Sequence, residues 1–265
     1  MGSLDGRTAV VTGGGSGIGR ASASLLASAG ASIVVVDRDG EAGRAHAESL
    51  GGLFFEADVS DAEAWSELVA SLKSGPGRVD IAHLNAGVVT QEAAIGALTD
   101  EQYRRIMGAN VDGVVFGVRA LAPVMAAGRG GAIVVTASLA GLIAFSPDPI
   151  YTLTKHAVVG LARALAPQLG ESGITINAVC PGLVDTPLLG EQARDLLSQA
   201  GFPIIPPEEI AQAVLACVTG SGSGQAIVCQ AGAEPVPYRF AGVPGPGGDL
   251  AGTRPPSELA AHDLP

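Results

Sequence analysis

The chain is poor in cysteine, in aromatic residues and in positive charge. Its three cysteines, Cys180, Cys217 and Cys229, are too few and too scattered for a disulfide framework or a zinc site, so we interpret them as buried small residues. Lys and Arg number 15 against 26 Asp and Glu, a net charge of -11. This balance argues against nucleic acid or an anionic membrane as a partner, since both require basic patches.

Long apolar segments are also missing. The first residues, "MGSLDGRTAVV", contain no long apolar stretch and include Asp5 and Arg7, which argues against a secretory signal. The most apolar window, at 21–36, is short and diluted by Ser and Gly, too short for a membrane span. The four histidines lack metal-ligand spacing, so we expect no metal. We therefore expect a cytoplasmic protein.

What the chain does have is a regular alternation of two kinds of segment. Short β-branched runs predict strands at 8–12, 32–37, 53–58, 79–84, 131–137, 174–179 and 225–229. Longer Ala/Leu-rich stretches predict helices at 17–29, 40–50, 61–73, 100–127, 150–170 and 207–219. This order predicts a single-domain α/β fold, a Rossmann-like doubly wound parallel sheet of about seven strands with helices on both faces.

Proline and glycine mark the limits of this pattern. Pro167 lies inside the helix expected at 150–170 and should kink it or end it early. We expect a catalytic domain over 1–235, followed by a Pro/Gly-rich tail over 236–265. The tail is either a flexible extension or a segment that reaches a neighbouring subunit or covers a pocket.

The turn after the first expected strand is rich in glycine. Its spacing is Gly13-x-x-x-Gly17-x-Gly19, at the start of a helix. Glycines let a backbone approach a ligand closely, and free N–H groups at a helix N-terminus suit a pyrophosphate. A single glycine-rich turn is weak support, because many such turns are only tight loops.

Carboxylates at the ends of the next two expected strands add weight to a nucleotide site. Asp37 can accept both hydroxyls of an adenosine ribose and would repel a 2′-phosphate, which favours NAD over NADP. Arg38 opposes this, because an arginine there can bind a 2′-phosphate. Asp58 can accept a hydrogen bond from the adenine amino group. Taken alone, Asp37 is also a turn residue or helix N-cap, and Asp58 is also an N-cap.

Further motifs follow in a characteristic order. They are "NAG" at 85–87, Ser138, and Tyr151 four residues before Lys155. Together with the glycine spacing, this set resembles the short-chain dehydrogenase/reductase family, over residues 4 to 228. The resemblance implies a nucleotide site formed by Gly13, Ser16, Gly17, Ile18, Gly19, Asp37, Arg38, Asp58, Val59, Asn85, Ala86, Gly87, Tyr151, Lys155, Pro181, Gly182, Val184 and Thr186.

Tyrosine and lysine four apart lie on the same face of a helix. Oxidising an alcohol requires a base, and a phenol with a pKa of about 10 is a poor one at neutral pH. A nearby ammonium favours the phenolate, so we expect Lys155 to lower the pKa of Tyr151, the acid/base. The alternative is a pair of side chains at a helix surface. As in the family, Lys155 would also hold the nicotinamide ribose.

Two more residues complete the expected catalytic set. Ser138 would hold the substrate oxygen beside Tyr151. Thr136 points to the same side of the strand and is an alternative, although family spacing favours Ser138. The resemblance also implies that Asn110 kinks a helix and holds a water in a proton relay. A helix cap or an ordinary side-chain-to-backbone bond is the alternative interpretation of Asn110.

Substrate choice is expected in a lid at about 183–206. A group of apolar residues would form the pocket: Ile143, Phe145, Ile150, Leu188, Leu189, Phe202 and Ile204. Few charges predict a small hydrophobic, uncharged alcohol or ketone. The prediction is therefore an NAD-dependent oxidoreductase that interconverts a secondary alcohol and a ketone.

Two alternatives stay open at this point. One is an NADPH-dependent ketone or 3-oxoacyl reductase, supported by Arg38. The other is a non-catalytic dinucleotide-binding sensor, which would not need Ser138, Tyr151, Lys155 or Asn110. The resemblance also implies a homodimer or homotetramer that pairs the helices at 100–127 and 150–170.

Overall fold

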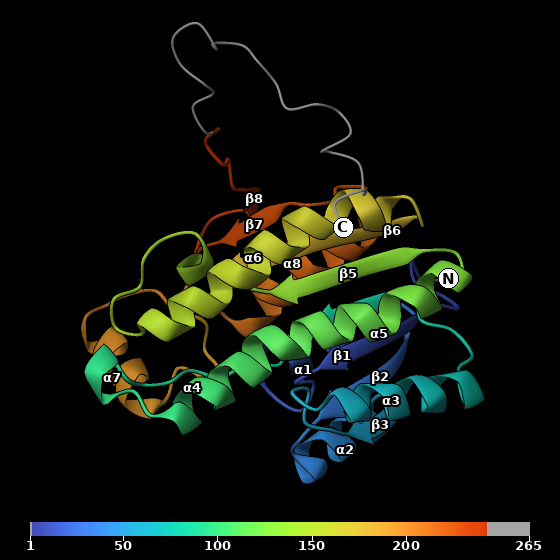
Figure 1. Cartoon of the computed structure of the whole chain (residues 1–265), viewed down its shortest axis with the longest axis horizontal. Coiled ribbons are helices and arrows are strands. Elements are labelled where there is room, and N and C mark those ends of the chain that lie inside the picture. The colour runs from blue at the N-terminus through green and yellow to red at the C-terminus, as the bar shows by residue number, and fades with distance from the viewer. Residues whose placement is uncertain (1, 243–265) are drawn as a thin grey trace, which may run out of the picture.

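A computed structural model of the chain describes residues 2–242. Within this range one eight-stranded sheet has the order β3-β2-β1-β4-β5-β6-β7-β8 (Figure 1). Its strands are β1 (Thr8–Thr12), β2 (Ser32–Asp37), β3 (Leu53–Glu56), β4 (Ile81–Leu84), β5 (Gly131–Thr136), β6 (Ile174–Pro181), β7 (Ala226–Cys229) and β8 (Val236–Pro237). All neighbours pair in parallel except β7 and β8. The predicted single-domain α/β fold is confirmed.

Helices cover both faces of the sheet. They are α1 (Gly17–Ser28), α2 (Gly40–Ser49), α3 (Ala62–Ser74), α4 (Asp100–Met107), α5 (Gly113–Ala127), α6 (Pro149–Gly170), α7 (Glu191–Gln199) and α8 (Pro207–Thr219), with short turns η1 (Ile95–Ala97), η2 (Gly108–Asp112) and η3 (Leu139–Gly141). One core packs α3, α5 and α6 on the sheet, and the other packs α1, α2 and α8. Figure 1 shows α5 and α6 crossing the same face.

The central strands are apolar because both of their faces are covered. All five residues of β1 and all four of β4 are buried. Within β2, Val34 and Val36 join one core while Ile33 and Val35 join the other. A fully buried Val or Ile side chain contributes about 1.5–3 kcal/mol, so these strands hold the two layers together.

The strand order reverses direction beside β1. The chain adds β2 and β3 on one side of β1 and then crosses to place β4 on the other side. In an open parallel sheet, ligands bind at the carboxyl ends of the strands at such a switch point. The candidate residues that follow β1, β2, β4 and β5 therefore lie along the same edge of the sheet.

Pro167 does not end α6 early, which contradicts one of the two predicted outcomes; a kink at Pro167 stays a prediction. The helix runs from Pro149 to Gly170 with Pro167 inside it. A proline removes one backbone N–H, but Pro167 and Arg163, four residues earlier, are both exposed, so water can satisfy the carbonyl of Arg163. The helix ends at a C-cap on Glu171, and the turn with positive φ is at Gly173.

The helix expected at 100–127 is interrupted. Between α4 and α5 the turn η2 is a π-helix, one residue wider than an α-helical turn. This helical run is also long and apolar enough to cross a membrane by length and composition, which our reading of the apolar windows overlooked. Core helices pass the same test, and Val114, Val118, Leu121 and Met125 of α5 are buried against the sheet. The absence of a membrane partner stays a prediction.

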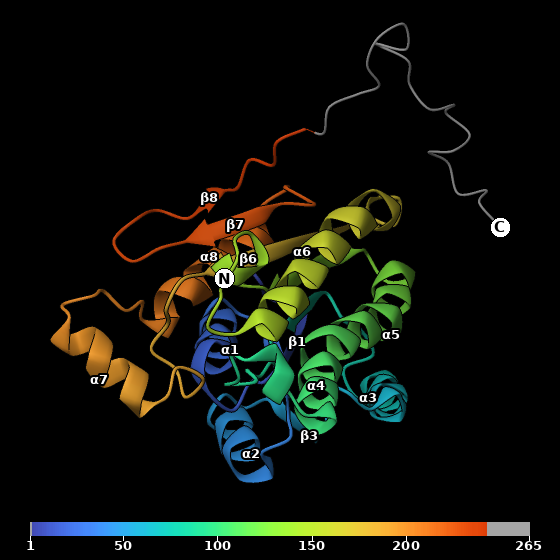
Figure 2. The ribbon, with the colours of Figure 1, turned by 60° about the vertical axis from the view of Figure 1, so that its left-hand side comes forward.

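One helix and one strand were not anticipated, and one expected strand is longer than predicted. The helix α7 lies in the expected lid and stands apart from the sheet in Figure 2. The short strand β8 pairs antiparallel with β7, at the start of the expected tail. In β6 the strand continues to Pro181, which as the last residue of a strand costs little despite its missing N–H. The rest of the expected tail, residues 243–265, lies outside the described range.

Candidate active site

The glycine-rich turn folds as a tight backbone loop between β1 and α1. Gly13 and Gly17 have φ of +64° and +50°, values that favour glycine. A Cβ on Gly19 would lie 2.1 Å from the carbonyl oxygen of Gly13, so this position also requires glycine. Ser16, the N-cap of α1, forms no side-chain cap hydrogen bond within residues 2–242. The first N–H groups of α1 are thus available to an anion.

Asp37 ends β2 next to this turn. Its Oδ2 accepts a hydrogen bond from the N–H of Gly15 at 2.8 Å, and its Oδ1 accepts one from the N–H of Asp39 at 3.0 Å. Asp39, not Asp37, is the N-cap of α2. Arg38 is exposed, and in the described part of the chain it forms no ion pair. The carboxylate of Asp37 is therefore held in place by two hydrogen bonds, whereas no ion pair holds the guanidinium of Arg38 in this range.

The third strand ends earlier than expected. β3 stops at Glu56, and Asp58 lies beyond it, where its Oδ1 accepts hydrogen bonds from the N–H and hydroxyl of Ser60. The pKa of Asp58 is lowered: these two hydrogen bonds and the charge of Arg38 outweigh desolvation, which acts in the opposite direction. The alternative that Asp58 caps a helix is wrong, because Asp61 caps α3.

Val59, expected to contact the nucleotide, has its side chain in the core. It is 8% exposed, and a Cβ on Gly113 would lie 2.7 Å from its Cγ2. Its carbonyl oxygen accepts a hydrogen bond from Nε1 of Trp65 at 2.9 Å. Only the backbone N–H of Val59 is left for a ligand. Ile18, similarly, packs against the core formed with α1 and α8.

The "NAG" segment is anchored to the end of β1. The hydroxyl of Thr12 accepts hydrogen bonds from the N–H groups of Asn85 and Ala86 at 2.9 and 3.1 Å. Nδ2 of Asn85 donates to the carbonyl of Thr12 at 3.1 Å. Since both segments lie at the switch point, these bonds fix the floor of the site.

Gly87 leaves room for two of the candidate catalytic side chains. A Cβ added to Gly87 would lie 3.2 Å from Oδ1 of Asn110 and 3.6 Å from Nζ of Lys155. The structure therefore brings Asn110 and Lys155 together beside Gly87. The two are far apart in the sequence, since Asn110 lies 44 positions before Thr154, the residue that precedes Lys155.

Ser138, Tyr151 and Lys155 meet where β5 ends and α6 begins. The Nζ of Lys155 lies 5.5 Å from the ring centroid of Tyr151 and donates a hydrogen bond to the carbonyl of Thr136 at 2.7 Å. Burial is the larger influence on the pKa of the Tyr151 phenol and raises it, and the hydroxyl of Ser138, which faces this phenol, acts in the opposite direction. The three predicted residues are thus brought together, on two elements joined by η3.

The expected lowering of the Tyr151 pKa by Lys155 is wrong. Burial raises the pKa of Tyr151 to about 12, and the charge of Asp148 adds to the rise. Burial also lowers the pKa of Lys155 to about 8. Desolvation disfavours both charged forms, so each group moves toward neutrality. The spacing of the two residues placed them correctly, but it carried no information on how dry the site is.

Thr136, the alternative to Ser138, is committed elsewhere. Its hydroxyl donates to Oδ1 of Asn85 at 3.0 Å and lies 2.9 Å from Nε2 of His83. His83 is fully buried, and burial lowers its pKa to about 3. The neutral imidazole therefore donates Nε2–H to Thr136. This leaves Ser138 as the residue whose hydroxyl faces Tyr151.

Asn110 lies in the π-helical turn η2 and is 1% exposed. Its Oδ1 accepts from the N–H of Val88 at 2.8 Å, and its Nδ2 donates to the carbonyl of Val88 and to Oγ1 of Thr154. These bonds strap the segment after "NAG" against α6. The interpretation as a side-chain-to-backbone bond is confirmed, and the water relay stays a prediction.

Asp148 is a site residue that our sequence reasoning did not select. It caps α6 by accepting the N–H of Tyr151 at 2.9 Å, and it also accepts the N–H groups of Thr90 and Gln91 at 2.8 and 3.3 Å. Gln91 is the non-glycine residue with positive φ in the described range, at 61°. The pattern Asp-Pro before Tyr151 was a usable signal for a helix start.

The segment after β6 folds back against the glycine-rich turn. A Cβ on Gly17 would lie 3.0 Å from Cγ2 of Thr186, and a Cβ on Gly182 would lie 2.6 Å from Oε1 of Gln230. Val184 is buried and forms a parallel bridge with Ile205. Of the residues expected here, Pro181, Gly182, Val184 and Thr186 all lie along this return path, and Thr186 reaches the N-terminus of α1.

The residues expected to form an apolar pocket differ in exposure. Four are exposed: Ile143 at 60%, Phe145 at 40%, Leu188 at 42% and Phe202 at 52%. Ile150 is buried in α6 and belongs to the packing of that helix. The exposed members come from two segments: Ile143 and Phe145 follow η3, between Ser138 and Tyr151, and Leu188 and Phe202 follow β6.

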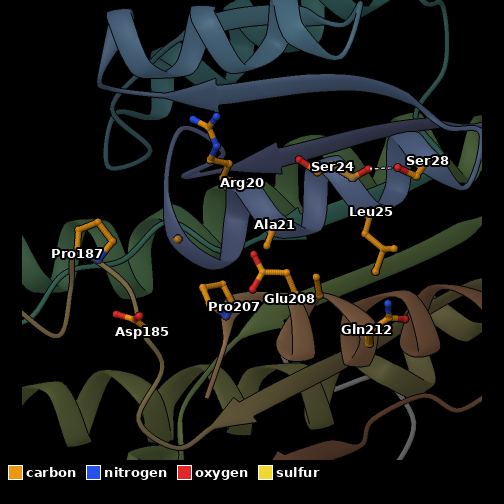
Figure 3. A pocket seen from close by; sticks show the side chains of 12 residues that line it. Arg20, Ala21, Ser24, Leu25, Ser28, Asp185, Pro187, Pro207, Glu208 and Gln212 are labelled. Carbon is orange, nitrogen blue, oxygen red and sulfur yellow. Dashed lines mark hydrogen bonds between the residues drawn. The ribbon is translucent and has the colours of Figure 1, made fainter. Parts of the chain in front are cut away.

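A separate cavity of about 480 Å³ lies between α1 and α8. Figure 3 shows Ala21 and Leu25 pointing from α1 toward Gln212 of α8. Ser138, Tyr151 and Lys155 do not line it. Among the residues described, no three His, Cys, Asp or Glu side chains gather in a group that could hold a metal.

Comparison with known proteins agrees with this geometry. The model of the short chain dehydrogenase family matches residues 7–196. A 2,5-dichloro-2,5-cyclohexadiene-1,4-diol dehydrogenase of Sphingobium indicum is 38% identical over 198 residues, covering 74% of this chain and 79% of the relative. An NAD-dependent oxidoreductase of Mycobacterium tuberculosis is 38% identical over 256 residues, covering 84% and 92%.

A solved structure shows the same fold. The crystal structure of a short-chain type dehydrogenase/reductase from Mycobacterium marinum has a TM-score of 0.80 and 31% identity, covering 86% of this chain and 96% of that one. The chain therefore belongs to the short-chain dehydrogenase/reductase family and is an oxidoreductase. Members bind a nicotinamide dinucleotide, and the glycine turn at the N-terminus of α1 suits its pyrophosphate.

Proposed function

We propose that the protein is an NAD-dependent oxidoreductase that interconverts a secondary alcohol and a ketone on a hydrophobic, uncharged substrate. The observation that carries the proposal is the meeting of Ser138, Tyr151 and Lys155 beside Gly87 at the switch point of the sheet. A protein that only senses the dinucleotide has no need of a phenol beside a buried amine, because it moves no proton.

The residues divide the proton chemistry between them. The bound nicotinamide supplies the hydride acceptor, or the hydride donor in the reverse direction. Ser138 donates a hydrogen bond to the substrate oxygen, and Tyr151 gives a proton to that oxygen in reduction or takes it in oxidation. In this proposal Lys155, whose Nζ donates to the carbonyl of Thr136, would hold a ribose hydroxyl and would receive the proton pathway that Asn110 begins.

The direction of the pKa shifts favours reduction at neutral pH. With its pKa raised to about 12, Tyr151 is protonated and ready to donate. Oxidation requires the phenolate, whose population rises with pH up to the pKa. The positive charges of a bound oxidised nicotinamide and of Lys155 beside its ribose would lower the pKa of Tyr151, since a nearby positive charge favours the phenolate.

Preference for NAD is supported by the order at Asp37. Both of its carboxylate oxygens are already oriented by backbone N–H groups, which points a fixed negative charge toward the space beyond β2. A 2′-phosphate there would meet this charge, whereas ribose hydroxyls would donate to it. Arg38 is the feature on which NADPH binding would depend, and it is exposed beside Asp58.

The substrate class is supported by the apolar residues around the site. Ile143 and Phe145 follow η3, and Leu188 follows the segment that reaches α1; all three are exposed. Apolar walls with few charges select uncharged rings or chains. The Sphingobium indicum relative is named for a chlorinated cyclohexadiene diol, so cyclic secondary alcohols are the first compounds to test.

The test combines binding and turnover. Titration calorimetry with NADH and NADPH on the wild type, Asp37→Ala and Asp39→Ala separates the cofactors, since Asp39 is a neighbouring carboxylate that only caps α2. We expect NADH to bind more tightly, and this preference to disappear in Asp37→Ala alone. Nicotinamide absorbance then follows turnover of cyclic secondary alcohols and their ketones.

Each outcome leads to one conclusion. Tighter binding of NADPH would transfer the assignment to Arg38 and to a ketone or 3-oxoacyl reductase. Binding of NADH without turnover of any alcohol or ketone, in the wild type as in Tyr151→Phe, would favour the dinucleotide sensor. Binding of neither nucleotide would contradict the proposal as a whole.

A further inference from the structure

One peptide group in the glycine-rich turn is held from both sides. The carbonyl oxygen of Gly14 lies 2.8 Å from Nδ1 of His46 on α2. The N–H of Gly15, which belongs to the same peptide, donates to Oδ2 of Asp37 at 2.8 Å. The two partners come from different elements, so this peptide links α2 to the carboxylate at the end of β2.

The ring of His46 has one arrangement that satisfies its neighbours. The residue is 2% exposed, and its Nε2 lies 3.0 Å from Oγ of Ser24 on α1. A carbonyl oxygen accepts only, so Nδ1 must carry the proton that bonds Gly14. Nε2 of the neutral ring then accepts from the hydroxyl of Ser24. The contact between Ser24 and His46 therefore joins α1 to α2.

The turn cannot hold this peptide by itself. Gly13, Gly14 and Gly15 have no side chains, and three glycines in a row leave the backbone free to rotate. A larger residue at position 15 is excluded, because a Cβ there would lie 2.9 Å from Oδ2 of Asp37. If the peptide turned over, the bond to His46 and the bond to Asp37 would be lost together.

Asp37 depends on this peptide for its orientation. Among residues 2–242 its Oδ1 accepts only from the N–H of Asp39, two residues away in the same turn, so the bond from Gly15 is the one that ties the carboxylate to the rest of the site. We propose that His46 is a positioning residue for nucleotide preference: by holding the Gly14–Gly15 peptide it orients Asp37 toward the ribose hydroxyls of NAD. This inference rests on the proposed NAD site.

Three variants isolate the bond to Gly14. In His46→Asn the amide nitrogen lies as many bonds from Cβ as Nδ1 does, so the bond to Gly14 can be kept. In His46→Gln the amide lies where Nε2 was, so the bond to Ser24 is kept and the one to Gly14 is lost. Ser24→Ala removes only the partner of Nε2. Dissociation constants for NADH and NADPH are measured on all three by titration calorimetry, with thermal unfolding as the control for folding.

The readout is the ratio of the two dissociation constants, because general damage to the fold weakens both nucleotides alike. We expect His46→Gln to weaken NADH binding roughly tenfold, because the loss of one hydrogen bond also loses the orientation of Asp37. The dissociation constant for NADPH should stay nearly unchanged. His46→Asn and Ser24→Ala should stay within about threefold of the wild type.

The outcomes also separate this inference from the proposed function. A wild type that prefers NADH, together with a His46→Gln variant that keeps this preference, would overturn the role of His46 and leave the NAD assignment intact. An equal loss of both nucleotides in His46→Gln would likewise show a structural role only. A wild type that does not prefer NADH would overturn both.

Discussion

At the scale of single residues, the phenol of Tyr151 makes the sharpest prediction. Because its pKa is raised to about 12, the rate of alcohol oxidation at saturating nucleotide should increase with pH from 7 to 10, while ketone reduction should not. Tyr151→Phe should lower kcat by about 10²–10⁴ in both directions, the usual contribution of a general acid or base.

The measurement is steady-state kinetics across this pH range on the wild type and the variant. Nucleotide binding by Tyr151→Phe serves as the control, and it should change little. An oxidation rate that is flat with pH would mean that the bound nucleotide and Lys155 have already brought the phenol pKa below neutrality, which would contradict the prediction.

Asp148 should contribute more to the free energy of unfolding than an ordinary helix cap does. Replacing it with Ala leaves the N–H groups of Thr90, Gln91 and Tyr151 without their acceptor, and Asp148 is only 4% exposed. We expect a loss of about 3 kcal/mol in the free energy of unfolding, since buried donors left unpaired cost about 1–3 kcal/mol. Asp61→Ala, at the exposed cap of α3, is the matched control and should lose about 1 kcal/mol.

Urea unfolding of both variants checks this difference. Equal losses would mean that water replaces Asp148 at the loop. Removing the carboxylate also removes one cause of the raised Tyr151 pKa, so the pH at which Asp148→Ala oxidises an alcohol should shift downward.

How far the site could be predicted follows from these residues. Tyr151 and Lys155 are four apart on one helix, so their meeting is a local fact that spacing reveals. Asp148 meets Thr90 and Gln91 across more than 50 positions, and His46 meets Gly14 across 32. Contacts of this kind depend on the packed sheet, and so does the dryness that sets the pKa of Tyr151.

At the scale of elements, the helix α6 continues through a proline, Pro167, in its interior. Replacing the exposed Pro167 with Ala restores a backbone N–H and a residue that favours helices. We expect a gain of about 1 kcal/mol and not the full 3, because the stiff proline also restricts the unfolded chain. Thermal unfolding checks this, and Ala164→Pro, one turn earlier in α6, should be strongly destabilising. A loss of stability in Pro167→Ala would mean that the proline supports a packing contact.

The elements themselves were the more predictable part. All seven expected strands are present. They could be predicted because a β-branched run bounded by glycine is a local signal that requires no knowledge of distant contacts. The ends of β3 and β4 were wrong by two residues, since hydrogen-bond pairing with a neighbour decides where a strand ends. The π-helical turn η2 was not predicted from the sequence, and Asn110 within it bonds Val88 across 22 positions, a contact that local patterns do not reveal.

At the scale of the whole molecule, the buried His83 makes stability depend on pH. Its pKa is about 3 in the folded protein and near 6.5 when unfolded, so the unfolded chain binds the additional proton between these values. Stability contributed by the neutral ring is complete above pH 6.5 and is lost as the pH falls toward 3. The full loss is on the order of 5 kcal/mol.

Urea unfolding at intervals between pH 7 and 4 measures this slope. His83→Val should reduce the slope of the free energy of unfolding against pH by the equivalent of about one bound proton. The control is His156→Val, since His156 is exposed and bonds only its own helix at Thr152. An unchanged slope in His83→Val would show that carboxylates alone set the acid sensitivity.

The short strand β8 has a consequence for how the molecule behaves among copies of itself. A sheet edge with unpaired N–H groups recruits the strands of neighbouring chains. Here the edge beside β7 is covered by Val236 and Pro237, with Pro235 just before them, and neither proline has an N–H to offer. During refolding at high concentration, this side of the sheet is therefore a poor template for β-aggregation, and a chain shortened before residue 235 would expose β7 in its place.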